Sequence, residues 1–315
     1  MLISLDFLAP GKPWPPPTEA ERLERYAQNK LLFEGKHEQV YKDWIRLLRE
    51  DQQATLEMVL NWHKRMTLLF ADLLLGEPPK IGAGDQDSPE QQAAERIIDD
   101  SGLMNVAYEV AIDVPRYGTG IFKIRYDRRA IIEGQQPAIW FPVVKPDNIK
   151  DIQAHVLAWT YEEDTQERGK TVTKKYLQTE VHERGRIISA KYPIENGIIG
   201  PAIEEAETET GVDEFLVVPV NNVLTTDRVT GLDDYSDLDS IIQELEVRIA
   251  QISRILDKHA DPNMYGPDTA LEHNPETGQW GYRGGGKYFP VGQGEQPPGY
   301  VTWDGQLEAA FKQID

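Results

Sequence analysis

The first third of the chain carries apolar residues at helical spacing. The segment Thr18-Glu19-Ala20-Glu21 has the pattern of a capping box, which predicts a helix from Thr18 to about Glu34. A second helix is expected over residues 37–50. The third predicted helix ends at Gly76 and has the clearest apolar face, with a repeat of about 3.6 residues: Leu56, Val59, Leu60, Met66, Leu69, Phe70, Leu73 and Leu74.

Two more helices are predicted before the pattern changes. Ser88 followed by Pro89 is typical of an N-cap with proline in the first turn, and this helix should end near Gly102. Another helix should reach Pro115 or Tyr117. The middle of the chain then shows β-rich runs separated by polar or glycine turns: residues 120–126, 138–144, 155–161, 171–181 and 186–192.

An acidic stretch follows these predicted strands. It contains no Lys or Arg, and it predicts a solvated loop: Glu204, Glu205, Glu207, Glu209, Asp213 and Glu214. Residues 215–220 are then expected to form a short buried strand. Together with the helical N-terminal third, these runs predict an α+β fold.

The most informative element is a long apolar stripe that begins after Ser236-Asp237-Leu238-Asp239, an acidic variant of the capping box. Its positions are separated by steps of four and three residues: Leu238, Ile242, Leu245, Ile249, Ile252 and Leu256. Ile241, Val247 and Ile255 widen it. A helix over 236–258 would be about 35 Å long. It could be the core helix of an ordinary domain or a helix that packs on neighbours in a bundle or ring.

The C-terminal part is rich in proline and glycine over residues 261–302, which predicts a small β-rich excursion with short strands near Trp280–Tyr282 and 287–289. A second helix is expected to begin near Asp304. It has no C-cap before Asp315, so we expect a chain that is cut within a helix or continues beyond it.

Charge narrows the possible functions. The chain has 33 Lys and Arg against 53 Asp and Glu, for a net charge of −20. This balance argues against a protein that grips nucleic acid through its phosphates, because such binding uses basic side chains that displace counterions. The sequence has no Cys, which excludes disulfides and thiolate chemistry. No membrane span is expected, since the longest apolar run, 68–75, is interrupted by Asp72.

The candidate chemistry is sparse. Residues 281–288 match the spacing of a phosphate-binding loop, but Tyr288 stands where Ser or Thr should bind magnesium, so a glycine-rich hairpin is the better interpretation. The histidines show no zinc-helix spacing. Four acids crowd the turn before the long helix, and capping explains them better than cation binding: Asp233, Asp234, Asp237 and Asp239. We therefore predict no catalytic residue, no metal site and no cofactor.

The order of these parts resembles the portal protein of tailed bacteriophages, the head-to-tail connector. Four stretches carry the resemblance: 25–35 (RYAQNKLLFEG), 61–79 (NWHKRMTLLFADLLLGEPP), 108–126 and 218–262. The resemblance implies a portal-like architecture: a helical and mixed-β wing over 1–235, a first stem helix over 236–258, a small β-rich clip over 259–302 and the start of a returning stem helix over 303–315. The family's tunnel loop and crown lie after the second stem helix, so the resemblance leads us to expect them to be missing from residues 1–315.

The resemblance also implies a function without catalysis. The protein would form a ring, usually of twelve subunits, at the portal vertex of the virion capsid, after assembly in the host cytoplasm. The ring would be a conduit for double-stranded DNA during packaging and ejection, without sequence-specific binding. Its expected partners are the terminase, head–tail adaptor proteins, and capsid and scaffold proteins.

Three groups of residues are candidate contacts. The stem-helix subunit interface is expected to use Leu238, Ile241, Ile242, Leu245, Ile249, Ile252 and Leu256. Arg248, Arg254 and Lys258 could contact DNA in the tunnel, or form surface ion pairs with Glu244 or Glu246. In the clip, Tyr282, Arg283, Lys287 and Tyr288 could dock terminase or adaptors, because aromatic residues and Arg are enriched in interfaces, or could pack within a hairpin.

Two other classes of function stay open at this level. An acidic, metal-dependent hydrolase could use scattered carboxylates that need no local spacing. An unrelated scaffold protein could form oligomers through the helix over 236–258.

Overall fold

The computed structural model describes residues 1–41, 59–167 and 170–260, and a few short segments after them: 264–265, 271–273, 275, 278, 280–282, 294 and 299–300. The chain divides into two compact units. The first consists of Met1–Val40 and Asn61–Asp239, and the second of Tyr41–Leu60 and Ser240–Asp315.

The N-terminal helices of the first unit are preceded by two 3₁₀ turns, η1 (Leu5–Leu8) and η2 (Pro17–Glu19). The helix α1 (Ala20–Phe33) follows, so the predicted helix exists but the capping box at Thr18 is wrong. Glu19 occupies the N-cap without a side-chain cap, because its buried carboxylate binds Arg22 and the amino group of Met1 instead. The predicted helix over 37–50 begins as α2 (His37–Val40), and residues 42–50 lie outside the described part.

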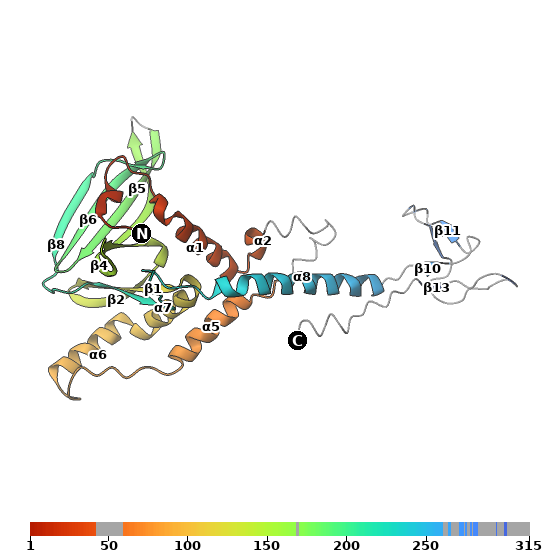
Figure 1. The fold of residues 1–315 in the computed structure, drawn as a ribbon, viewed down its shortest axis with the longest axis horizontal. Coiled ribbons are helices and arrows are strands. Elements are labelled where there is room, and N and C mark those ends of the chain that lie inside the picture. The colour runs from red at the N-terminus through yellow and green to blue at the C-terminus, as the bar shows by residue number, and fades with distance from the viewer. Residues whose placement is uncertain are drawn as a thin grey trace. The chain divides into compact units, whose positions relative to one another are not determined.

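Local signals set the next helices accurately. Ser88 caps α6 (Pro89–Ser101) by accepting a hydrogen bond from the Gln91 amide, and Gly102 ends it in the left-handed conformation. Helix α7 (Leu103–Tyr117) follows directly. Helix α7 lies beside β1 and β2, and α6 lies beside β2, as Figure 1 shows.

Helix α5 (Trp62–Leu75) forms as predicted, but most of its apolar side chains are not in the core. Its fully buried positions are His63, Thr67 and Ala71, whereas Leu69 is 57% and Leu73 is 78% exposed. The helix thus turns a small, polar face toward its own domain. The part of the predicted face before residue 59 lies outside the described residues.

The strands of the first unit form two antiparallel sheets. The smaller sheet has the order β2-β1-β9, with bounds β1 (Thr119–Asp127), β2 (Arg129–Gln135) and β9 (Val217–Asn221). The larger sheet has six strands, in which β8 also pairs with β6. Its bounds are β3 (Trp140–Lys145), β4 (Asn148–Glu167), β5 (Lys170–Glu183), β6 (Arg186–Glu195), β7 (Ile198–Ile199) and β8 (Glu204–Glu209). Another 3₁₀ turn, η4 (Pro137–Ile139), precedes β3.

Several strands differ from the sequence prediction. Strand β2 was not expected, and β8 replaces part of the predicted acidic loop. Every residue of β8 is exposed, yet it pairs with β6 from Arg186↔Glu209 to Lys191↔Glu204. Its glutamates lie near basic residues of β6, such as Arg186, which forms an ion pair with Glu207. Strand β9 is buried only at Val217, while Val218 and Val220 are exposed.

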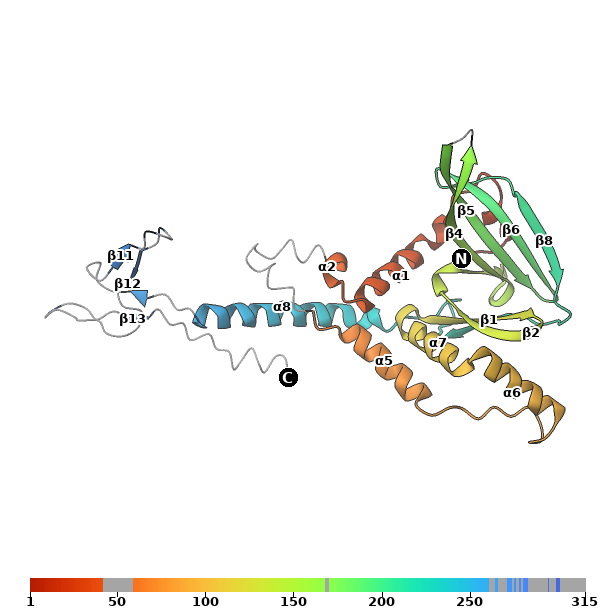
Figure 2. The same cartoon turned by 180° about the vertical axis from the view of Figure 1, so that it is seen from behind.

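The larger sheet holds the main apolar core. Phe141, Val156 and Leu177 are almost completely buried in a cluster that Leu2 and Leu8 also join. A second cluster contains Ile121, Trp140, Leu157 and Val217, and therefore links the two sheets. Figure 2 shows the strands β4, β5, β6 and β8 of this sheet from behind.

The long predicted helix is present as α8 (Tyr235–Ala260), which is 26 residues, or about 39 Å, long. Its start belongs to the first unit. In the second unit, β10 (Met264–Tyr265) pairs with β13 (Gly299–Tyr300), and β11 (Leu271–His273) pairs with β12 (Trp280–Tyr282). These pairs agree with the predicted β-rich excursion near Trp280–Tyr282. The expected strand over 287–289 and the helix from Asp304 lie outside the described residues.

Candidate functional site

The first turn of α8 is fixed to the first unit by a buried tyrosine. Tyr235 is 1% exposed, and its hydroxyl lies 2.8 Å from Thr67 Oγ1 and 3.3 Å from the carbonyl oxygen of His63. The Tyr235 ring also packs on the His63 imidazole, with ring centres 4.7 Å apart. Because the buried face of α5 carries small and polar residues, it can receive this aromatic ring and pair its hydroxyl.

An arginine on α1 holds the same turn electrostatically. Arg25 donates to Asp233 at 2.9 Å and to Asp239 at 2.6 Å, and Asp239 also contacts His63 Nε2 at 3.1 Å. The Asp233 carboxylate accepts a hydrogen bond from the Ser236 amide at 2.9 Å, so it caps the helix. The expectation that capping explains the acids of this turn therefore holds for Asp233. We call Arg25, His63, Thr67, Asp233, Tyr235 and Asp239 the α8 anchor.

Burial and pairing act against each other in the α8 anchor. Burial alone would raise the pKa of Asp233, but the hydrogen bonds and charge of Arg25 outweigh it and hold the pKa below its usual range. Burial likewise opposes the charged form of Arg25, yet its two carboxylate partners raise the guanidinium pKa. The ion pair thus stays charged although its members are largely withdrawn from water.

A close approach of two glycines positions the segment that leads into α8. A Cβ at Gly231 would lie 2.0 Å from the carbonyl oxygen of Gly118, and Gly118 itself has φ +78°. The Gly231 amide donates to Thr119 Oγ1 at 3.0 Å. Only glycine fits here, since any side chain would push the two backbones apart.

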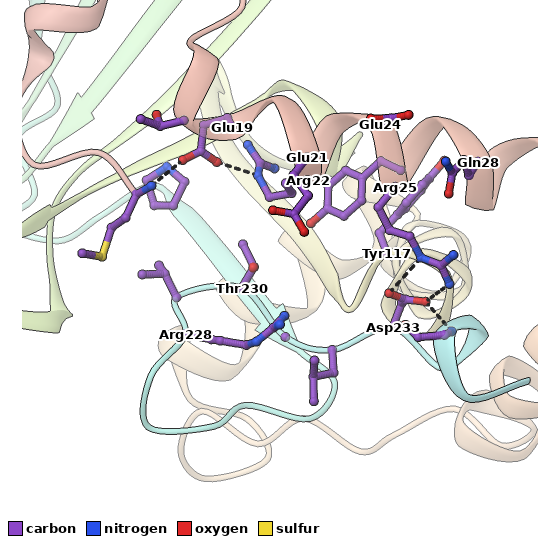
Figure 3. Close-up of a pocket in the computed structure, with 18 of the residues that line it drawn as sticks. Glu19, Glu21, Arg22, Glu24, Arg25, Gln28, Tyr117, Arg228, Thr230 and Asp233 are labelled. Carbon is purple, nitrogen blue, oxygen red and sulfur yellow. Dashed lines mark hydrogen bonds and ion pairs between the residues drawn. The ribbon is translucent and has the colours of Figure 1, made fainter. Parts of the chain in front are cut away.

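A polar hollow of about 670 Å³ lies between α1 and residues 227–233. Figure 3 shows Glu19, Arg22 and Arg25 on the α1 side and Arg228, Thr230 and Asp233 on the opposite loop. Arg22 is satisfied by Glu19 and by the carbonyl oxygens of Pro137 and Trp140. Sequence reasoning missed the hollow. Its two sides come from segments about 200 residues apart, so no local sequence motif marks it.

Some charged groups of the hollow have no ion-pair partner among the described residues. These are Glu21 and Glu24 on α1 and Asp227 and Arg228 on the loop, and all four are exposed. The arrangement therefore presents separated negative and positive groups in a concave surface. It is suited to recognising a polar partner by charge and hydrogen bonding.

The predicted interface residues of α8 differ in exposure. Ile241 is 65% exposed, whereas Ile242 and Ile252 are 4% and 8% exposed within the single chain. Leu238, Leu245 and Ile249 are half-buried. The side chain of Leu256 lies outside the described part.

The predicted DNA contacts are only partly described. Arg248 forms an ion pair with Glu244 at 2.8 Å and donates to Gln251. This is one of the surface pairs that the sequence left open. The side chains of Arg254 and Lys258 lie outside the described part, as do the side chain of Tyr282 and all of Arg283, Lys287 and Tyr288.

Among the described residues, no group of three or more His, Asp and Glu side chains could hold a metal ion. None of the described helices has the length and apolar character needed to cross a membrane.

A comparison with protein families identifies the chain. The family model described as "phage portal protein, SPP1 Gp6-like" matches residues 17–266, which include the α8 anchor, all of α8 and every lining residue of the hollow except Met1. No curated protein matches the chain. The family match confirms the portal resemblance predicted from the sequence. The chain therefore belongs to the phage portal protein family, SPP1 Gp6-like.

Proposed function

We propose that this protein is a portal subunit that forms a ring, of twelve copies in the virion, and lets double-stranded DNA pass during packaging and ejection. The portal family is structural rather than enzymatic, and it implies a ring at the capsid vertex with phage head and tail components. The ring would dock terminase and then head–tail adaptors, contact capsid and scaffold proteins, and assemble in the host cytoplasm.

Within this proposal the chain has four functional parts. Residues 1–235 are the wing, 236–258 the first stem helix, 259–302 the clip and 303–315 the start of the returning stem helix. The pairing of β10 with β13 supports the clip assignment, because it brings Met264 close to Tyr300 and closes the excursion at its base.

The observation that carries the proposal is the α8 anchor. A helix of 26 residues is held at its first turn by two aspartates and a tyrosine, while Ile242 and Ile252 farther along are buried within the chain. Ile241 remains 65% exposed on the apolar stripe of this helix. A stem helix in a ring needs such an arrangement, since a heterologous contact must offer apolar surface to neighbouring subunits.

The charge of the chain supports a conduit rather than a DNA-binding protein. With a net charge of −20, a subunit repels phosphates, and a tunnel lined by it would retain DNA weakly. Arg248, Arg254 and Lys258 are the proposed moving contacts of the tunnel. The ion pair of Arg248 with Glu244 engages its guanidinium, which argues against a DNA contact at this residue.

The clip residues Tyr282, Arg283, Lys287 and Tyr288 are the proposed docking surface for terminase and adaptors. Tyr and Arg often dominate the binding energy of interfaces, which supports this choice.

Electron microscopy of the purified chain, with light scattering for its mass, tests the proposal. We expect a discrete ring of about twelve subunits with a through-channel. A monomer with metal-dependent hydrolysis would favour the enzyme alternative, and a ring without a channel would favour an unrelated scaffold. Packaging by Arg254→Ala particles, with Arg248→Ala for comparison, tests the DNA contacts, and unchanged packaging in both would reject them.

A further inference from the structure

We infer that subunits are joined by a knob and a socket: the tip of the β1–β2 hairpin of one copy enters the polar hollow beside α1 of the next copy. This inference rests on the proposed ring and names a contact within it. We define the knob as Tyr126 and Arg128, and the socket as Glu21, Glu24 and Arg228 with the hollow that they line.

The knob is an exposed aromatic and basic tip on an acidic protein. Tyr126 is 79% exposed, the highest value among the exposed large apolar and aromatic side chains of the described part. Arg128 has φ +62°, a left-handed conformation that is uncommon for a residue with a side chain. A glycine or asparagine would be the easier choice for this turn, so an arginine here calls for another explanation.

Arg128 differs from the two neighbouring arginines in having no ion-pair partner among the described residues. Arg125 is paired with Glu133, and Arg129 lies 3.2 Å from Asp100. Arg128 forms no ion pair with any residue that the structure describes, although the subunit carries a net charge of −20. Its charge is therefore available to a partner outside the subunit.

The socket has the complementary chemistry. Glu21 and Glu24 are exposed and have no ion-pair partner in the described ranges, so they can receive an arginine. Arg228 can lie over the face of a tyrosine in a cation–π contact. A volume of about 670 Å³ is large enough for both side chains of the knob. Tyr and Arg are also, together with Trp, the side chains enriched at the energetic centre of interfaces.

The two surfaces lie at opposite ends of one strand. The socket includes Tyr117 and Gly231 beside the first residue of β1, where Gly231 contacts Thr119. The knob lies past the last residue of β1, where Asp127 pairs with Arg129. The nine residues of this strand span about 30 Å. Different and complementary patches at opposite ends of a rigid element produce a head-to-tail contact, which closes into a ring when the rotation per subunit fits.

Cysteine cross-linking tests this contact directly, because the chain has no native Cys. The double variant Arg128→Cys with Glu21→Cys should give, after oxidation of assembled protein, a ladder of covalent oligomers larger than dimers. Positions 128 and 21 of the same chain cannot form this disulfide, because they lie near opposite ends of β1. A disulfide requires the two Cα atoms to come within about 7 Å of each other. Each single variant should give dimers at most, and serves as the matched control.

The outcomes separate the contact from the ring itself. If wild-type protein forms rings but the double variant gives no ladder, the knob-and-socket contact is overturned while the portal proposal stands. A ladder from Arg128→Cys with Glu205→Cys would instead place the knob on the acidic strand β8 and would also overturn it. If wild-type protein forms no ring, the proposed portal function is rejected, and the contact that rests on it is rejected as well.

A charge reversal gives a second, independent readout. Arg128→Glu should lower the assembled fraction at least tenfold, and Arg128→Glu with Glu21→Arg should restore it. Arg128→Gly removes the charge while relaxing the turn, so its monomer should fold normally but assemble as poorly as the Glu variant. Normal assembly of Arg128→Gly would contradict the inference.

Discussion

The core of the larger sheet and the α8 anchor are both buried, but they are held by different forces. Leu177, Phe141 and Val156 are at most 1% exposed and contact one another through apolar surface alone. The α8 anchor combines the buried ring of Tyr235 with directed contacts, chiefly those of Arg25 and of the Tyr235 hydroxyl. Apolar burial is non-directional, whereas hydrogen bonds and ion pairs fix distances and angles.

This difference suggests what each region contributes. The sheet provides most of the stability of the first unit, because burying apolar side chains contributes more free energy than a few polar contacts do. The α8 anchor fixes where a long helix begins through directed polar contacts, at a smaller gain in free energy, and it leaves Ile241 exposed. The predictions below test this division.

The largest loss of stability is expected in the sheet core. Leu177→Ala should lower the free energy of unfolding by about 2–5 kcal/mol, since the removed side chain is fully buried and leaves a cavity. Chemical denaturation measures this. Val172→Ala on the same strand is the control. Val172 is 39% exposed, so this variant should lower the free energy of unfolding by less than about 0.5 kcal/mol. Equal losses of unfolding free energy in Leu177→Ala and Val172→Ala would show that apolar burial in the sheet is not the main source of stability.

The sheet also contains a histidine that should make stability depend on pH. Burial lowers the pKa of His155 to about 4, and Trp140 Nε1 donates to His155 Nδ1, which must be unprotonated. The unfolded chain binds the proton more readily, so this stability is present above pH 6.5 and is lost as the pH falls toward 4.

The free energy of unfolding should fall by about 3 kcal/mol between pH 6.5 and pH 4. Denaturation at several pH values measures it, and the difference between wild type and His155→Gln isolates this residue. Parallel curves for the two proteins would refute the prediction.

In the α8 anchor, removing a charge should lower the free energy of unfolding by less than the changes in the sheet core do. Arg25→Ala should cost about 2 kcal/mol, because it leaves Asp233 and Asp239 without their main partner. Arg25→Lys should lose about half as much, since an ammonium group cannot reach both carboxylates as the planar guanidinium does. Hydrogen exchange of the Ser236 amide should become faster in both variants. Unchanged exchange would show that the anchor does not fix the start of α8.

The smallest effect is expected for the hydroxyl of Tyr235. Tyr235→Phe keeps the ring but removes the contact with Thr67, which should cost about 1 kcal/mol. Tyr126→Phe makes the same chemical change at an exposed position, and it should leave the unfolding of the monomer unchanged. A loss at Tyr235 as large as at Leu177 would remove the contrast between the two regions.

The sequence predicted elements well where a local signal sets them. Ser88, Pro89 and Gly102 bound α6 as expected, and the heptad-like stripe predicted α8 within two residues at each end. The capping box at Thr18 failed because Glu19 found a stronger interaction with Arg22 and the amino group of Met1. The strand β8 was missed because its glutamates favour a loop locally, and only pairing with β6 makes them a strand.

The choice of buried face could not be predicted for α5. Its apolar residues Met66, Leu69 and Leu73 suggested a core-facing side, but the domain accepts His63, Thr67 and Ala71 instead. Periodicity identifies which residues share a face, and it does not say which neighbour that face meets.

By itself, the amino-acid sequence determined the α+β class, the long helix, the excess of negative charge and the portal family, because each is recorded in neighbouring residues or in their order. The tertiary structure alone decided that Arg25 reaches Asp233, 208 positions away, and that a hollow opens between α1 and residues 227–233. Such contacts depend on how distant segments are brought together, and the energy of a charge depends on the partner and the burial it finds there.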